Sequence, residues 1–162
     1  MRNAVKKDFR DIYSSPMSQG TRCHQLATYI VFDSPLVMLC DAPTAYRKEP
    51  ECTRFIAGLP VVADETRILQ GKMGEYIVTA RRVGEDWIVG GLTDWEARTV
   101  DLDLSFLPEG MFRAEIFCDG INADKKGEDY RHEYRDVKRE DRLKMQLAPG
   151  GGFAIRLKKN HN

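Results

Sequence analysis

The longest apolar stretch of the chain lies close to its N-terminus, within residues 20–42. From Leu26 to Phe32 the sequence runs Leu, Ala, Thr, Tyr, Ile, Val, Phe, with almost no polar interruption. Thr21 can cap a helix by accepting a hydrogen bond from a first-turn N–H, so the stretch predicts a helix from Cys23 to Asp33. Because this helix is apolar on nearly every side, we expect it to be buried on more than one side.

Two shorter helical segments are predicted after it. Ser34 followed by Pro35 suits the start of a helix, which predicts a second segment ending near Cys40. The run Glu49 to Glu51 places acidic residues in the first turn of a third helix, which Gly58 ends.

After Pro60 the spacing of apolar residues changes to the alternation typical of strands. Tyr130 to Lys144 fits either a helical face or two strands joined by a turn, and its neighbours favour the strands. The other predicted strands are Glu75–Arg81, Trp87–Leu92, Thr99–Leu104, Met111–Phe117, Leu143–Leu147 and Phe153–Leu157. Strands in succession without intervening helices predict a mainly β fold, an antiparallel β-sandwich of about eight strands of the Greek-key type, after two or three α-helices.

Composition excludes several classes of partner. The chain has 162 residues, with 25 Lys and Arg against 25 Asp and Glu, so its net charge is zero and nothing favours binding to nucleic acid or an anionic membrane. No apolar run reaches the roughly 18 residues of a membrane span, because Asp33, Pro35 and Asp41 interrupt the longest one. The N-terminal residues lack the apolar segment of a signal peptide.

The side chains that could bind a metal ion are the four cysteines and the carboxylates of one acidic loop. The loop from Asp119 to Asp129 could offer oxygen atoms to calcium, but Lys125 and Lys126 lie within it, and Asp, Asn and Gly are common in long hairpin loops. The cysteines follow no CxxC or Cys/His pattern, which predicts buried free thiols and no metal site. They are Cys23, Cys40, Cys52 and Cys118.

Aromatic rings and the start of the long helix are the candidates for ligand contact; Trp87, Trp95, Tyr76 and Tyr130 could together form an aromatic platform for a sugar. Trp87 begins an apolar strand and is expected in the core, whereas Trp95 lies in a loop and is expected to be an exposed ring that could stack on a sugar. Arg22 and His24 open the long helix, where they could cap it or form the edge of a ligand site. No two carboxylates lie on elements expected to converge, so the residues alone predict no catalytic pair.

Six ordered strings carry a resemblance to a known family. They are SSPMSQGTRCHQLATYIVFDSPLVMLCDAPTAY, KEPECTRFIAGLPVVADET, GEYIVTARRVGEDWIVGGLTDW, LDLSFLPEG, FCDGINAD and LAPGGGFAIRL. Together they resemble the C-terminal part of the glycoside hydrolase family 97 enzymes, which are α-glucosidases and α-galactosidases.

The resemblance implies a division of the chain and a role for each part. Residues 1–60 would be the last loop and helices of an incomplete (β/α)8 barrel, and residues 61–162 would be the C-terminal β-sandwich. The family's catalytic acid, its base or nucleophile and its calcium-binding glutamates would lie upstream, so this chain would carry no cofactor and no glycosidase activity by itself. We expect it to brace the barrel of a parent enzyme that acts on α-linked oligosaccharides; the alternative is an independent carbohydrate-binding module.

The resemblance also implies partners, a site and a location. Arg22 and His24 would lie near the face of the barrel that holds the active site. Without the barrel, the helix at residues 23–33 would expose large apolar side chains, so we expect it either to fold back on the sandwich or to pair with a second copy. The family resemblance implies a periplasmic or extracellular protein.

Overall fold

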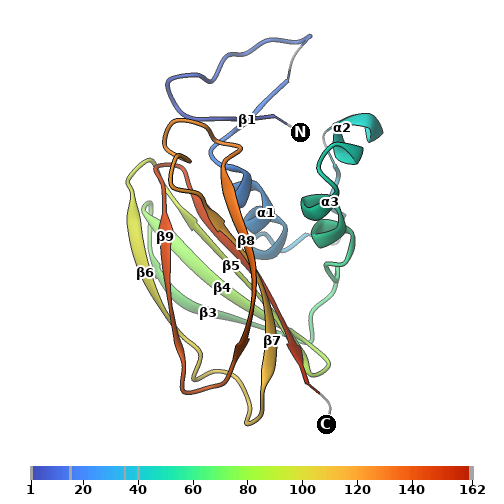
Figure 1. Ribbon diagram of the computed structural model, residues 1–162, viewed down its shortest axis with the longest axis vertical. Helices are drawn as coiled ribbons and strands as arrows, with labels where there is room; N and C mark the ends of the chain where they lie inside the picture. The colour runs from blue at the N-terminus through green and yellow to red at the C-terminus, as the bar shows by residue number, and fades with distance from the viewer. Residues whose placement is uncertain (1, 15, 35, 40, 161–162) are drawn as a thin grey trace.

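The computed structural model describes residues 2–14, 16–34, 36–39 and 41–160. Two antiparallel sheets face each other, one of six strands in the order β3-β4-β5-β10-β7-β8 and one formed by β6 and β9 (Figure 1). The strands of these sheets are β3 (Glu65–Lys72), β4 (Tyr76–Val83), β5 (Asp86–Thr93), β6 (Arg98–Asp103), β7 (Phe112–Asp119), β8 (Tyr130–Val137), β9 (Arg142–Leu147) and β10 (Gly152–Lys159). The helices are α1 (Arg22–Val31), α2 (Pro43–Arg47) and α3 (Pro50–Ala57).

The connections between the two sheets are of the Greek-key type. The chain leaves the six-stranded sheet after β5 to form β6, returns as β7 and β8, and crosses again to form β9. It returns a last time as β10, which pairs with β5 on one side and β7 on the other. The predicted antiparallel sandwich of about eight strands is therefore confirmed, and Tyr130–Lys144 does form two strands.

Alternation along the central strands assigns each side chain to one of two cores. In β5, Trp87 and Val89 face the two-stranded sheet, whereas Ile88 between them faces α1. In β10, Phe153 belongs to the first core and Ala154 to the second. The six-stranded sheet is thus covered on one face by β6 and β9 and on the other by α1 and α3 (Figure 1).

Helix α1 lies unusually close to the sheet because glycines face it. A Cβ atom at Gly90 would lie 2.9 Å from the Cβ of Ile30, so only glycine allows this approach. The predicted cap is present, since the Thr21 Oγ1 accepts a hydrogen bond of 3.1 Å from the His24 N–H. The inward side chains Leu26 and Ile30 are completely buried, so the helix folds back on the sandwich and this face is closed to a second copy.

The shorter helices match the predictions only in part. The third predicted helix is confirmed as α3, which begins at Pro50 and has Gly58 as its C-cap. The second is wrong, because residues 36–39 are not helical, while Pro35 and Cys40 lie outside the described residues. Residues 36–39 are exposed, and a helix this short needs packing that the chain does not offer there. Helix α2 was not predicted and begins at Pro43, shortly after the expected end of the second segment near Cys40.

Three strands, β1, β2 and β3, were not predicted from the sequence. Strand β3 is an edge strand that pairs only with β4, and a register shift between Ile68 and Gln70 interrupts its alternation. Its side chains are mostly exposed or half-buried, so no buried face marks it in the sequence. The N-terminal residues, for which no strand was predicted, form a short parallel pair of β1 (Asn3–Ala4) and β2 (Ser18–Gln19). Among the described residues, no helix has the length and apolar character needed to cross a bilayer.

Candidate functional site

Arg22 is the centre of a buried polar network at the start of α1. Its side chain is completely buried, its Nε donates a hydrogen bond of 2.6 Å to the Asn3 Oδ1, and its Nη1 lies 3.1 Å from the Glu49 Oε2. Nη2 lies 3.8 Å from the Glu128 Oε1. Although burial opposes the charged form, Glu49 raises the pKa of Arg22 above its ordinary value. The guanidinium thus ties the N-terminal segment, the start of α3 and the β7–β8 loop to α1.

His24 and Trp95 both contact the turn before β10. The His24 Nδ1 lies 3.1 Å from the Gly151 carbonyl oxygen, and burial lowers the pKa of His24 despite that contact. Trp95 is half-buried, and its ring covers Gly150, where a Cβ would collide with it. The Lys6 Nζ lies 5.9 Å from the centre of the same ring. Trp95 is therefore less open than the exposed ring that the sequence predicted.

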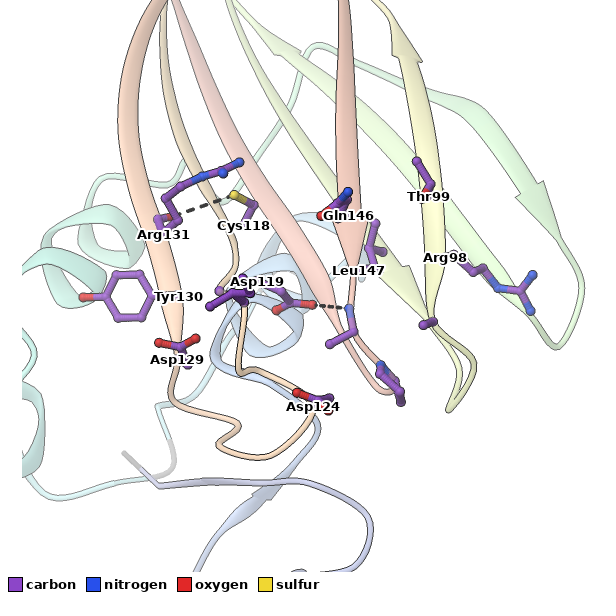
Figure 2. A pocket seen from close by; sticks show the side chains of 15 residues that line it. Arg98, Thr99, Cys118, Asp119, Asp124, Asp129, Tyr130, Arg131, Gln146 and Leu147 are labelled. Atoms are coloured by element: carbon purple, nitrogen blue, oxygen red, sulfur yellow. Dashed lines mark hydrogen bonds between the residues drawn. The ribbon is translucent and has the colours of Figure 1, made fainter.

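A hollow of about 730 Å³ opens at one end of the sandwich (Figure 2). It lies between the β7–β8 loop and the adjacent ends of β6 and β9. The polar residues around it include Arg98, Thr99, Asp119, Asp124, Asp129 and Gln146. This mixture of carboxylates, amide and hydroxyl groups is the type of lining that could bind a polar ligand.

The most buried carboxylate of this hollow serves the fold. The Asp119 Oδ2 accepts hydrogen bonds from the N–H groups of Ala148 (2.9 Å, dashed in Figure 2) and Gly152 (3.0 Å). Burial raises the pKa of Asp119 to about 6, although these hydrogen bonds and one with Thr21 oppose the shift. Asp119 therefore joins β7 to the turn before β10 and to the N-terminus of α1.

Other charged groups of the hollow are also engaged. The Asp129 Oδ2 accepts a hydrogen bond of 2.9 Å from the Asn122 N–H, which holds the β7–β8 loop in shape. Arg98 points away from the other labelled side chains in Figure 2, and its Nη1 lies 3.0 Å from the Glu75 Oε2. The hollow consequently does not present the two free carboxylates that glycoside hydrolysis requires.

Two carboxylates of the acidic loop take part in the hydrogen bonding of the fold. In the part of the chain that the structure describes, no three His, Cys, Asp or Glu side chains are grouped so that they could hold a metal ion. Asp119 and Asp129 instead accept hydrogen bonds from backbone N–H groups. The described cysteines, Cys23, Cys52 and Cys118, are buried free thiols, as predicted for them.

A group of exposed apolar side chains lies apart from the hollow. The segment that follows α1 presents large apolar side chains, which are between 41% and 78% exposed. These side chains, which we call the outer apolar surface, are Phe32, Leu36, Val37, Met38 and Leu39.

Two grooves flank the outer apolar surface. One, of about 430 Å³, runs between Leu36–Met38 and the outer face of α1, where His24, Thr28 and Tyr29 line it. The other, of about 700 Å³, runs between Leu39 and helices α2 and α3. His24 is therefore the one sequence-predicted site residue that borders this surface, because Arg22 is enclosed and Trp95 lies at the turn before β10.

The outer apolar surface was missed because its residues were assigned to a helix. Apolar residues such as Leu36 and Met38 favoured a helix, yet their side chains stay largely exposed in the described part of the chain. The apolar run that continues past Pro35 could have identified this surface. The preceding helix can already cover the sheet, so further apolar residues after it indicate a second contact.

Comparison with known proteins gives consistent matches. Residues 62–158 match the family model described as "Glycosyl-hydrolase 97 C-terminal, oligomerisation". Over 158 residues the chain is 56% identical to a retaining alpha-galactosidase of Bacteroides thetaiotaomicron, a match that covers 98% of this chain and 24% of the relative. A probable retaining alpha-galactosidase of Streptomyces bingchenggensis is 30% identical over 130 residues, covering 80% of this chain and 19% of the relative.

Solved structures give the same result. A glycoside hydrolase family 97 enzyme from Pseudoalteromonas sp. strain K8, in complex with acarbose, superimposes with a TM-score of 0.85 at 38% identity over 88% of this chain and 23% of that chain. A beta-arabinopyranosidase matches with a TM-score of 0.66 at 28% identity, covering 86% of this chain and 21% of that chain. The chain thus spans about a quarter or less of the length of the proteins it matches.

Proposed function

Because the chain belongs to the glycosyl-hydrolase 97 C-terminal family, we propose that it braces the catalytic part of a glycoside hydrolase and performs no hydrolysis by itself. The outer apolar surface is the observation that carries this proposal. Complete burial of a fully exposed large apolar side chain is worth roughly 1.5 to 3 kcal/mol. These side chains are between 41% and 78% exposed, so covering them together would stabilise an assembly by several kcal/mol.

The occupant of this surface is the catalytic region of the same enzyme. The relatives are about four to five times as long as the matched segment, which leaves a large region available to cover it. Helix α1 has its inner face on the sandwich and borders a groove on its outer face, so it lies between the two parts as a last barrel helix would.

The proposed substrate class is an α-linked galactoside. Two relatives that match the chain are named as retaining alpha-galactosidases, and this supports a galactoside over a glucoside. Asp119 and Asp129 of the hollow accept hydrogen bonds from the backbone, which leaves Asp124 and no carboxylate pair there, so the reacting groups would come from the catalytic region.

The alternative role, an independent carbohydrate-binding module, has less support. It requires an aromatic ring free to stack on a sugar, whereas Trp95 covers Gly150 and lies beneath Lys6. Titration of the chain with galacto- and maltooligosaccharides, followed by Trp fluorescence, tests it. Saturable quenching would favour the module over the bracing role.

Bracing is tested by adding the chain to a shortened relative. The retaining alpha-galactosidase of Bacteroides thetaiotaomicron would be produced without its matching C-terminal segment, and its activity during heating would be followed with and without this chain. We expect the chain to prolong activity, and the double variant Leu36→Ser, Met38→Ser to lose most of that effect. The control variant Ile121→Ser changes a side chain that is 95% exposed on the β7–β8 loop and should protect as well as the wild type. A shortened enzyme that is equally heat-stable without the chain would exclude bracing.

A further inference from the structure

The groove between Leu39 and helices α2 and α3 has a mainly apolar lining. Its volume is about 700 Å³, and Leu39, Pro43, Pro50 and Ala57 contribute apolar surface to it. Leu39 is 47% exposed and belongs to the outer apolar surface, so the groove continues that surface toward the two helices. Exposed apolar area of this kind marks contact with another protein surface.

Basic side chains at this groove have no acidic partner in the described part of the chain. Arg47 of α2 and Arg54 of α3 line the groove, and Lys48 follows directly after α2. All three are exposed, and none of them forms an ion pair with a described residue. Both arginines lie in the last turn of their helices, where a positive charge also stabilises the helix. Their position beside an apolar groove gives them a second possible role, which is to attract a partner.

The acidic residues of the same segment already have partners. Glu49 pairs with Arg22 of α1, and Glu51 accepts a hydrogen bond of 3.0 Å from the Tyr130 hydroxyl of β8. Asp41, which also lines the groove, accepts a hydrogen bond of 2.7 Å from the N–H of the next residue. The charge at the groove that lacks an ion-pair partner among the described residues is therefore positive.

Helix α3 is anchored at both ends, so this wall of the groove is preformed. At its start, the N-cap residue Glu49 pairs with the buried Arg22. Near its end, the Arg156 Nη2 donates a hydrogen bond of 2.7 Å to the Phe55 carbonyl oxygen, and the guanidinium lies 4.9 Å from the centre of the Phe55 ring. A Cβ at Gly58 would lie 2.8 Å from that Nη2, so glycine permits this approach. A partner that binds the groove therefore loses little free energy in ordering it.

We propose that the catalytic region of the same enzyme places an apolar segment in this groove, with carboxylates of that segment beside Arg47 and Arg54. This inference rests on the proposed bracing role and adds the chemistry of the contact. The chain covers 24% of the Bacteroides relative, so most of that enzyme lies outside the matched segment and is available to fill the groove. The lining favours apolar side chains, and the two guanidinium groups favour Asp or Glu beside them, because Lys or Arg would be repelled.

Carbodiimide cross-linking of a hybrid enzyme tests the contact. The retaining alpha-galactosidase of Bacteroides thetaiotaomicron would be produced with this chain in place of its matching segment. Arg47→Lys and Arg54→Lys keep the positive charge and introduce amines, which carbodiimide joins to adjacent carboxylates. We expect mass spectrometry to find links from these two positions to carboxylates of the catalytic region. Lys144, which is exposed on β9 of the opposite sheet, is the internal control and should form no such link.

Neutral variants of the hybrid measure the contribution of the two charges. Hydrogen exchange of the α2 and α3 amides in the hybrid would be compared with the same amides in the isolated chain. Arg47→Gln combined with Arg54→Gln should lower the protection gained in the hybrid about two- to thirty-fold, the range for two partly exposed ion pairs. Arg135→Gln combined with Lys144→Gln removes the same charge from exposed positions on β8 and β9 and should leave that protection unchanged.

The outcomes distinguish this inference from the bracing role. Protection gained at residues 36–39 without links from positions 47 and 54 to the catalytic region would overturn the inference and leave bracing intact. Links to a second copy of the enzyme, or equal losses of protection in the two pairs of neutral variants, would also overturn the inference alone. A hybrid that gains no protection at residues 36–39, α2 or α3 would overturn both.

Discussion

At the scale of single residues, buried ionisable groups hold together parts of the chain that are distant in sequence. Asp119 accepts hydrogen bonds from the turn before β10, and Arg22 pairs with Glu49 and Glu128. Buried charges with such partners are costly to leave unpaired. These side chains therefore fix how the N-terminal segment, the helices and the loops meet the sandwich.

Asp119 makes a contribution to stability that decreases as the pH rises. Its pKa in the folded chain is about 6, above the ordinary 3.8, so between these values the folded state binds a proton that the unfolded state releases. The free energy of unfolding contributed by this group therefore falls as the pH rises from about 4 to about 6, by roughly 2 to 3 kcal/mol, and is constant above.

The variant Asp119→Asn keeps an oxygen acceptor but does not titrate. Urea unfolding of both proteins at pH 4 and pH 7 should show the wild type losing roughly 2 to 3 kcal/mol relative to the variant between the two values. An equal difference between the proteins at both pH values would contradict this assignment.

The sequence could identify Arg22 and His24 as unusual but could not assign their roles. Both follow the predicted cap Thr21, which suggested a polar edge open to a ligand. The partners of Arg22, Glu49 and Glu128, lie 27 and 106 residues further along the chain, and no local pattern links them to it. The structural role of Arg22 therefore follows from ion pairs with distant residues, which the sequence alone does not show.

At the scale of elements, prediction succeeded where one face of an element is buried. The side chains of β5 and β10 alternate between two cores, and α1 packs Leu26 and Ile30 on the sheet. The periodicity of apolar residues in these elements is therefore visible in the sequence. Prediction failed where burial is weak, as in the edge strand β3 and the exposed segment 36–39. A helix was predicted in that segment from apolar residues whose side chains are largely exposed among the described residues.

The position of α1 on the sheet gives an element-scale prediction. Gly90→Ala would place a methyl group 2.9 Å from the Ile30 Cβ and 3.1 Å from the Ala27 carbonyl oxygen, which pushes the helix outward. We expect it to lower the free energy of unfolding by about 1 to 3 kcal/mol, measured by urea denaturation. Gly71→Ala, on the edge strand with its nearest contact at 3.3 Å, is the control and should cost less. Equal losses in the two variants would show that the helix does not depend on Gly90.

At the scale of the whole molecule, a well-packed sandwich contrasts with the exposed outer apolar surface. The six-stranded sheet is covered on both faces, whereas Leu36 and Met38 are at least three-quarters exposed. Contiguous exposed apolar side chains mark interaction sites. Together with membership of the glycosyl-hydrolase 97 C-terminal family, this contrast supports a role in assembly.

The most direct measurement maps which face the catalytic region covers. Hydrogen exchange of this chain would be compared with and without the shortened alpha-galactosidase that lacks its matching segment. The account predicts new protection in residues 36–39 and in α2 and α3, with no change in β6 and β9 on the opposite face. Protection around the hollow at Asp119 and Asp124 without any at residues 36–39, or no protection at all, would contradict it.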